Sequence, residues 1–124
     1  MANIRSFKEL KVWQRSMEAA VAVFELSKKF PDAEKYSFTD QIRRASQSVP
    51  SNISEAWRKR RYPNHFISKL SDSDAEAAET ENWLAFARAC DYLAQEPHDQ
   101  LCAEYDQINR LLNAMMQDPT KWTK

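Results

Sequence analysis

Residues 98–117 read HDQLCAEYDQINRLLNAMMQ. The apolar positions in this stretch recur at alternating spacings of four and three residues, which places their side chains on one face of an α-helix. Asp118 and Pro119 follow, and proline cannot continue a helix, so the helix is expected to end at about residue 117. The pattern predicts an amphipathic helix whose buried face consists of Leu101, Tyr105, Ile108, Leu112 and Met115.

A first helix is expected upstream, over about residues 7–29. Ser6 and Glu9 have the S-x-x-E spacing of a capping box, in which the two side chains satisfy backbone N–H groups left open at a helix start. The helix carries two apolar stripes on different faces, and one bundle core accepts only one of them easily. We therefore expect the second stripe to form a contact between subunits; it consists of Val12, Ala19, Val23, Leu26 and Phe30.

Two more helices are expected over about residues 35–60 and 64–94. Pro50 lies inside the first of these, and its ring removes a backbone N–H and crowds the carbonyl one turn earlier, which predicts a kink near Pro50. Four long helices joined by short connections predict one domain, residues 1–124. The expected fold class is all-α, an antiparallel up-down-up-down four-helix bundle.

The composition excludes several kinds of active site. The chain has no glycine, so it cannot carry a P-loop, a dinucleotide-binding loop or a nucleophile elbow. Neither His65 nor His98 has a glutamate three residues before it, as di-iron bundles require. Cys90 and Cys102 lack the spacing of a metal or redox motif and are expected to be buried free thiols. We therefore expect no enzyme activity, no cofactor and no metal.

Charge is distributed unevenly along the chain. The 18 basic and 18 acidic residues cancel overall. Residues 41–62 nevertheless hold six Arg and Lys residues against Glu55 alone, and residues 63–106 hold ten carboxylates against two cations. No segment has the length and apolar character of a membrane span, and the N-terminal residues lack the apolar region of a signal peptide, so a cytoplasmic location is expected.

An ordered series of motifs resembles a known family. It comprises FKELKVWQ at 7–14, Phe-Pro at 30–31, QIRRA at 41–45 and SVPSNISE at 48–55. The series resembles the bacterial family of proteins encoded in intervening sequences of 23S rRNA genes, and it is similar to the accessory protein of diversity-generating retroelements. The resemblance implies a small antiparallel bundle that assembles into a homopentameric ring. In the retroelement members it also implies a basic surface that binds nucleic acid.

One position departs from the family pattern. Members usually have glycine after Asn-Ile-x-Glu, whereas this chain has Ala56. The helix is therefore expected to continue through Ala56, and a loop geometry taken from members with glycine does not apply here.

Three hypotheses for function follow. The first is an oligomer that binds RNA or DNA electrostatically, through cations flanked by Trp57 and Tyr62; the alternative for these cations is a solvated helix end that complements the helix dipole. The second is an assembly protein whose basic and acidic segments meet between subunits, unless they pair within one subunit. The third is an adaptor for a protein partner such as a polymerase. The candidate nucleic-acid-binding residues are Arg43, Arg44, Arg58, Lys59, Arg60 and Arg61.

Overall fold

The computed structural model describes residues 4–122, so residues 1–3 and 123–124 of the expected domain lie outside it. This part of the chain forms four α-helices with short 3-10 turns before, between and after them. The helices are α1 (Lys11–Ser27), α2 (Phe38–Arg58), α3 (Pro63–Ala89) and α4 (Gln95–Gln117), and the turns are η1 (Phe7–Glu9), η2 (Asp32–Glu34) and η3 (Pro119–Lys121). The predicted all-α class and the four helices are confirmed.

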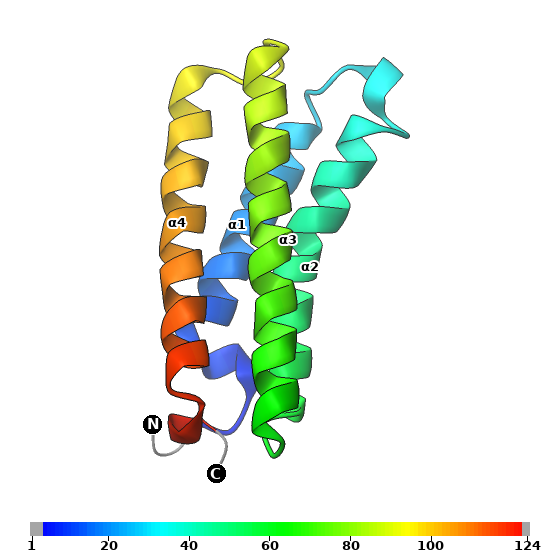
Figure 1. Ribbon diagram of the computed structural model, residues 1–124. Helices are drawn as coiled ribbons and strands as arrows, with labels where there is room; N and C mark the ends of the chain where they lie inside the picture. Colours follow the sequence, from blue (N-terminus) through cyan, green and yellow to red (C-terminus); the bar gives the residue numbers. More distant parts are fainter. Residues whose placement is uncertain (1–3, 123–124) are drawn as a thin grey trace.

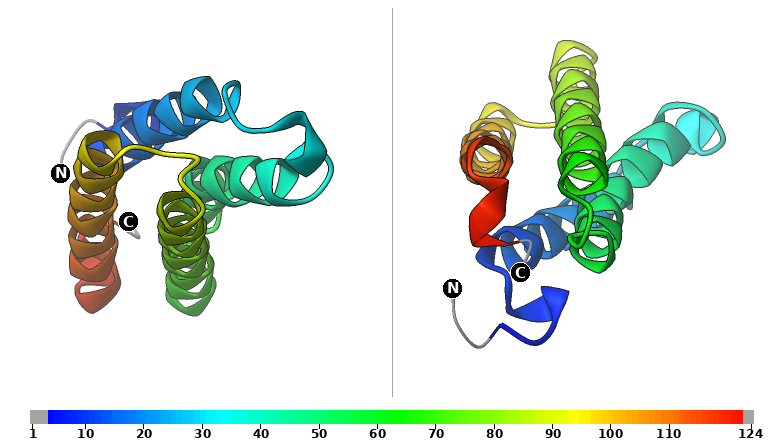
Figure 2. Two further views of the ribbon diagram at one scale, coloured as in Figure 1. Left: turned by 90° about the horizontal axis from the view of Figure 1, so that it is seen from above. Right: turned by 60° about the horizontal axis from the view of Figure 1, so that its bottom comes forward.

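The helices are arranged as an up-down bundle in which each helix packs against two neighbours (Figure 1). The contacts join α1 with α2, α2 with α3, α3 with α4, and α4 back to α1, and the packing is most extensive between α2 and α3. Seen from above, α1 and α2 form one layer that is inclined against the layer of α3 and α4 (Figure 2). The α2–α3 turn lies at the same end of the bundle as η1 and η3 (Figure 1).

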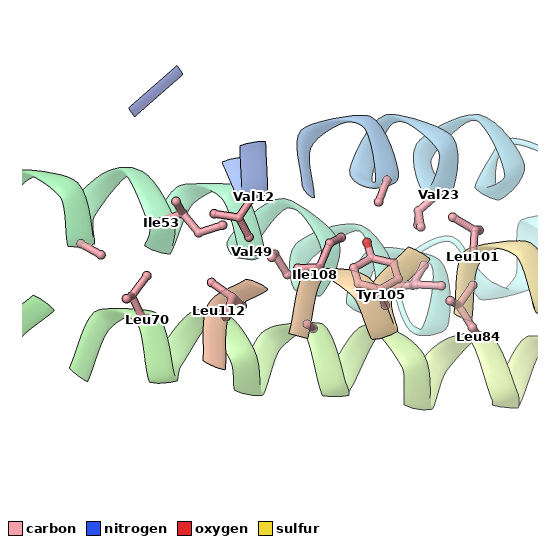
Figure 3. Packing of buried hydrophobic residues seen from close by; sticks show 14 of the residues in the cluster. Val12, Val23, Val49, Ile53, Leu70, Leu84, Leu101, Tyr105, Ile108 and Leu112 are labelled. Atoms are coloured by element: carbon pink, nitrogen blue, oxygen red, sulfur yellow. The ribbon is translucent and has the colours of Figure 1, made fainter. Parts of the chain in front are cut away.

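In α4 the core uses the apolar face that the helical spacing predicted. All five predicted residues of α4 are buried, and they meet Val49 and Ile53 from α2 and Leu70 and Leu84 from α3 (Figure 3). One polar group lies among them: the Tyr105 hydroxyl is buried and has no hydrogen-bond partner among the described residues. Burial raises the pKa of Tyr105, so its phenol is neutral at any ordinary pH.

Pro50 lies inside α2 without ending it. The helix continues to Arg58, and Ile53 and Ala56, which follow the proline, are fully buried. The Asn52 amide donates to the carbonyl oxygen of Ser48 at 3.0 Å. The carbonyl that loses its helical N–H partner to Pro50 is that of Ser46, four residues earlier, so this bond does not replace the missing one. The angle of the predicted kink stays a prediction.

The predicted start of the first helix is wrong. The capping box forms, since the Ser6 hydroxyl accepts from the Lys8 N–H and the Glu9 carboxylate accepts from the Ser6 N–H. It caps only η1, because the backbone of Leu10 is extended (φ −71°, ψ 127°) and its side chain enters the core. The α-helix therefore begins at Lys11.

The third helix also ends earlier than predicted, at Ala89 and not at about 94. Asp91 takes a left-handed conformation (φ 60°), and the Tyr92 N–H donates to the Ala87 carbonyl at 2.8 Å. The Asp91 N–H donates to Arg88, which completes a Schellman motif. Glycine usually occupies the left-handed position, so a chain without glycine hides this signal. The fourth helix consequently starts at Gln95, with Pro97 inside its first turn.

Candidate nucleic-acid interface

Arg58 is the last residue of α2, and Lys59, Arg60 and Arg61 follow it in the connection to α3; we call these four residues the basic turn. The Lys59 N–H still makes helical hydrogen bonds to the carbonyls of Glu55 and Ala56 in α2. Tyr62, by contrast, takes the extended backbone that is favoured before a proline, so α2 does not continue into α3. Pro63 then starts α3. The sequence therefore places these cations at the C-terminal end of a helix, where positive charge is stabilised by the helix dipole.

Arg60 differs from its neighbours in the basic turn. Its guanidinium lies over the indole of Trp57, 4.0 Å from the ring centroid, and donates to the Trp57 carbonyl oxygen at 2.8 Å. Arg60 is half-buried and satisfies a carbonyl at the end of α2. It is therefore committed to the fold, and we expect it to be the weakest contributor to any ligand contact.

The other three cations of the basic turn are exposed. Arg58, Lys59 and Arg61 form no ion pair with a carboxylate among the described residues. The one acidic side chain in this segment, Glu55, pairs instead with Lys69 of α3, at 3.2 Å. The turn therefore presents three uncompensated positive charges to solvent.

Of the two aromatic residues expected to flank these cations, only one is accessible. Trp57 is 6% exposed and its ring is covered by Arg60, so it cannot stack on a base as the sequence suggested. Tyr62 is 57% exposed, and its ring lies 5.7 Å from that of the exposed His65. Tyr62 is thus the one flanking ring that a base could reach.

Arg43 and Arg44 do not join the basic turn. Fifteen residues separate Arg43 from Arg58 along α2, which corresponds to about 22 Å. Arg44 is exposed and pairs with Asp40 at 2.9 Å. Arg43 is half-buried, donates from Nε to the Ser27 hydroxyl at 2.6 Å and lies over the Phe24 ring. The six predicted residues therefore occupy opposite ends of α2.

The apolar stripe expected to stay exposed on α1 is the one that faces the core. Val12, Ala19, Val23 and Phe30 are buried within the single chain, and Leu26 is partly buried. The expectation that they form an exposed patch is wrong, because this face of α1 packs into the core of the single chain. Exposed apolar residues instead follow another face of α1 and consist of Met17 (37%), Val21 (53%) and Phe24 (39%).

The acidic segment of the chain is divided between α3 and α4, and its α3 part is partly desolvated. Burial raises the pKa of Asp74, and it also raises the pKa of Glu81, whose carboxylate accepts from the Asn109 amide at 3.2 Å. Within the described part of the chain, no three His, Cys, Asp or Glu side chains are grouped so that they could hold a metal ion. Together the carboxylates of α3 give this helix a negatively charged face.

A Cys–His–Asp arrangement on α4 went unnoticed in the sequence. His98 lies 2.9 Å from an oxygen of Asp99 through Nδ1 and 3.6 Å from the sulfur of Cys102 through Nε2. Burial, with the nearby Glu81 and Asp99 charges, raises the pKa of the Cys102 thiol. A catalytic cysteine needs the opposite shift, towards thiolate. Both cysteines are free, as predicted, but the predicted burial is wrong for Cys90, which is exposed, and Cys102 is only partly buried.

The fold and this end of the molecule define an all-α four-helix bundle with a cationic turn at one end. The family model for 23S rRNA-intervening sequence protein matches residues 8–114, and the chain belongs to that family. It is also similar to a crystal structure of a protein with unknown function from the S23 ribosomal protein family of Bacteroides thetaiotaomicron. The identity is 31%, the TM-score is 0.77, and the match covers 85% of this chain and 97% of the other.

Two further comparisons bear on function. No curated protein sequence matches the chain. Among residues 4–122, no helix has the length and apolar composition needed to cross a bilayer.

Proposed function

We propose that this protein is a non-enzymatic, oligomeric helical bundle that binds nucleic acid electrostatically through its basic turn. The observation that carries the proposal is the exposure of Arg58, Lys59 and Arg61 without carboxylate partners among the described residues. Cations in this state attract phosphates and release counterions on binding.

The expected binding is tolerant of sequence. The cations lie at a helix end and in a turn, not along the face of a helix that could enter a groove. The exposed side chains that could contact nucleic acid there are three cations and the ring of Tyr62. Cations contact phosphates and an aromatic ring stacks on any base, so neither distinguishes one sequence from another. RNA and DNA single strands are therefore both expected to bind, with an affinity that falls steeply as salt is added.

Oligomer formation would strengthen this binding. The exposed α1 stripe of Met17, Val21 and Phe24 supports self-association, since neighbouring apolar side chains on a surface favour a protein contact. The resemblance suggests five subunits in a ring, and a ring repeats the basic turn once per subunit. If these turns face the same way, one strand can contact several of them, which raises the overall affinity.

Fluorescence anisotropy with labelled single-stranded RNA and DNA at about 50 mM salt tests the proposal. The variant Arg58→Gln/Lys59→Gln/Arg61→Gln retains Arg60 and hence the end of α2. It should lose nearly all binding while keeping the wild-type circular dichroism and molar mass.

The matched control removes three positive charges elsewhere. Lys29→Gln/Arg44→Gln/Arg110→Gln changes three exposed cations that lie outside the basic turn and outside η1 and η3 at the same end of the bundle. This variant has the same net charge as the test variant, and it should bind within about twofold of the wild type. No binding by the wild type, or equal losses in the two variants, would show that the basic turn does not bind nucleic acid.

A second candidate function is an assembly or adaptor role with no nucleic acid involved. The same α1 stripe supports it, because that apolar face can receive a different protein as well as a second copy. An oligomer that forms normally while the wild type fails to bind either nucleic acid would favour this role.

A further inference from the structure

A polar pocket of about 240 Å³ lies between the C-terminal end of α1 and the N-terminal end of α2. This end of the bundle is opposite the basic turn (Figure 1). Three cations line the pocket, Lys28, Lys35 and Arg43, against a single carboxylate, Asp32. We infer that this pocket binds a compact oxyanion of the phosphate class, either free or as the terminal phosphate of a larger molecule.

Arg43 is held in place for this role. Its Nε donates to the Ser27 hydroxyl at 2.6 Å, and Cζ lies 4.7 Å from the centroid of the Phe24 ring. Its two terminal nitrogens donate to no protein group among the described residues. A guanidinium presents its donors in a planar fork that matches two oxygens of a phosphate. A half-buried arginine without a carboxylate partner is thus ready to bind an anion.

Thr39 provides a second, independent observation. It lines the same pocket and is only 5% exposed, and its hydroxyl has no hydrogen-bond partner among the described residues. A buried hydroxyl without a partner is energetically costly. Rotation about its Cα–Cβ bond would let it donate to a ligand oxygen in the pocket. Thr39 is also the second residue of α2, and the N-terminal end of that helix already receives a carboxylate, since the Ser37 hydroxyl donates to Glu34 at 2.7 Å. Anion binding in the pocket therefore depends on Arg43 and Thr39 and not on the helix dipole.

The last backbone carbonyl oxygens of α1 are already hydrogen-bonded, so they are not left unpaired beside an anion in the pocket. The carbonyl oxygens of Glu25, Leu26 and Ser27 accept, in that order, from the N–H groups of Lys28, Lys29 and Phe30. The Phe24 carbonyl accepts from the Ser27 hydroxyl at 2.7 Å. Of the lining cations, Lys28 has a carboxylate partner, the exposed Glu25 at 3.2 Å. The pocket therefore retains net positive charge.

Isothermal titration calorimetry with inorganic phosphate tests the inference, with sodium chloride at equal ionic strength as the reference titrant. The wild type should bind phosphate and give no comparable heat with chloride. Arg43→Gln should weaken phosphate binding about tenfold, the effect expected for a charge-assisted hydrogen bond. Arg44→Gln removes the same charge from the next residue, which does not line the pocket, and should bind like the wild type.

A second pair of variants tests the inference independently, in case Arg43→Gln does not fold. Lys35→Gln changes an exposed lining residue and should weaken binding, while Lys29→Gln changes an exposed cation that does not line the pocket and should not. Thr39→Val keeps the shape of the side chain, removes the hydroxyl and should also weaken binding. Equal heats for phosphate and chloride, or equal losses within each pair, would overturn the inference.

A third comparison identifies the source of the phosphate. A trinucleotide with a 5′-phosphate should compete with inorganic phosphate if the pocket takes terminal phosphates, and the same trinucleotide with a 5′-hydroxyl should not. If neither trinucleotide competes with inorganic phosphate, the pocket binds free phosphate only. The inference does not rest on the proposed function, since the variants of the basic turn leave this pocket unchanged.

Discussion

The hydroxyl of Ser73 on α3 donates a hydrogen bond, 2.9 Å long, to the backbone carbonyl of Val49 on α2. Both residues are fully buried, and Val49 immediately precedes Pro50. The bond is a direct tie from a side chain of one helix to the backbone of the other. It requires the two helices to approach closely, and small buried residues on each, such as Ala45 and Ala77, permit that approach.

Removal of this tie should destabilise the fold. We expect Ser73→Ala to lower the free energy of unfolding by about 1 kcal/mol, the net value of a typical hydrogen bond. Urea denaturation measures the change. Ser71→Ala on the exposed side of α3 is the matched control, because it gives the same gain in helix propensity without touching Val49. Equal unfolding midpoints for the two variants would contradict the prediction.

The left-handed residue at the end of α3 predicts a stabilising substitution. Asp91→Gly should raise the free energy of unfolding by about 0.5 kcal/mol, because glycine adopts a positive φ without steric cost. The gain is reduced by loss of the exposed ion pair with Arg88. Ala89→Gly, within the last helical turn, should instead destabilise by about 1 kcal/mol. A thermal melt of both variants checks the opposite signs.

Glu34 predicts a loss of stability in acid. The Ser37 hydroxyl and then the Tyr92 hydroxyl, which donates at 2.8 Å, lower the pKa of Glu34. A carboxyl with a lowered pKa stabilises the folded state above its ordinary pKa of about 4.3, and the stabilisation disappears as the pH falls through the folded-state value. The urea midpoint of Glu34→Gln should therefore fall less than that of the wild type between about pH 6 and pH 3.

Tyr92→Phe refines this experiment. It removes the second hydrogen bond to Glu34 and leaves the one from Ser37. Its acid sensitivity should lie between those of the wild type and Glu34→Gln. Identical pH profiles for all three proteins would show that these hydrogen bonds do not stabilise the ionised carboxylate.

The exposed stripe of α1 predicts how an oligomer would be disrupted. Val21→Lys places a charge at the centre of the stripe of Met17, Val21 and Phe24. Light scattering should then give the mass of one chain, whereas the wild type should give a multiple of it. The control Ala78→Lys adds the same charge at an exposed position of α3 and should leave the mass unchanged. A wild type that is monomeric at micromolar concentration would refute self-association.

The sequence allowed much of the core to be predicted and little of the site. The regular spacing in α4 identified every buried residue of its apolar face, because most exposed positions of that helix carry polar residues. In α1 both faces are apolar, so periodicity could not decide between them. Packing against the other helices decides which of the two faces is buried, and no local pattern reports such a tertiary contact.

The candidate binding residues were found by charge, and charge alone does not show which cations have partners. In the sequence, Arg43 and Arg60 cannot be told apart from Arg58. In the structure, Arg60 stacks on Trp57 and Arg43 donates a hydrogen bond to Ser27. Thr39 carried no signal at all, since its relevance depends on a buried hydroxyl left without a partner among the described residues. Contacts between distant segments decided each of these cases.

The neighbour-to-neighbour packing of the helices has a kinetic consequence. Three of the four helix interfaces join helices that are consecutive in the chain, and only α1 with α4 brings distant segments together. That last interface includes the two parallel hydrogen bonds between Arg15 and Glu104, each 2.9 Å long. A topology with mostly local contacts folds in milliseconds or less, because little loop entropy is lost before contacts form. We expect the helical hairpins to form first and the closure of α1 onto α4 to come last.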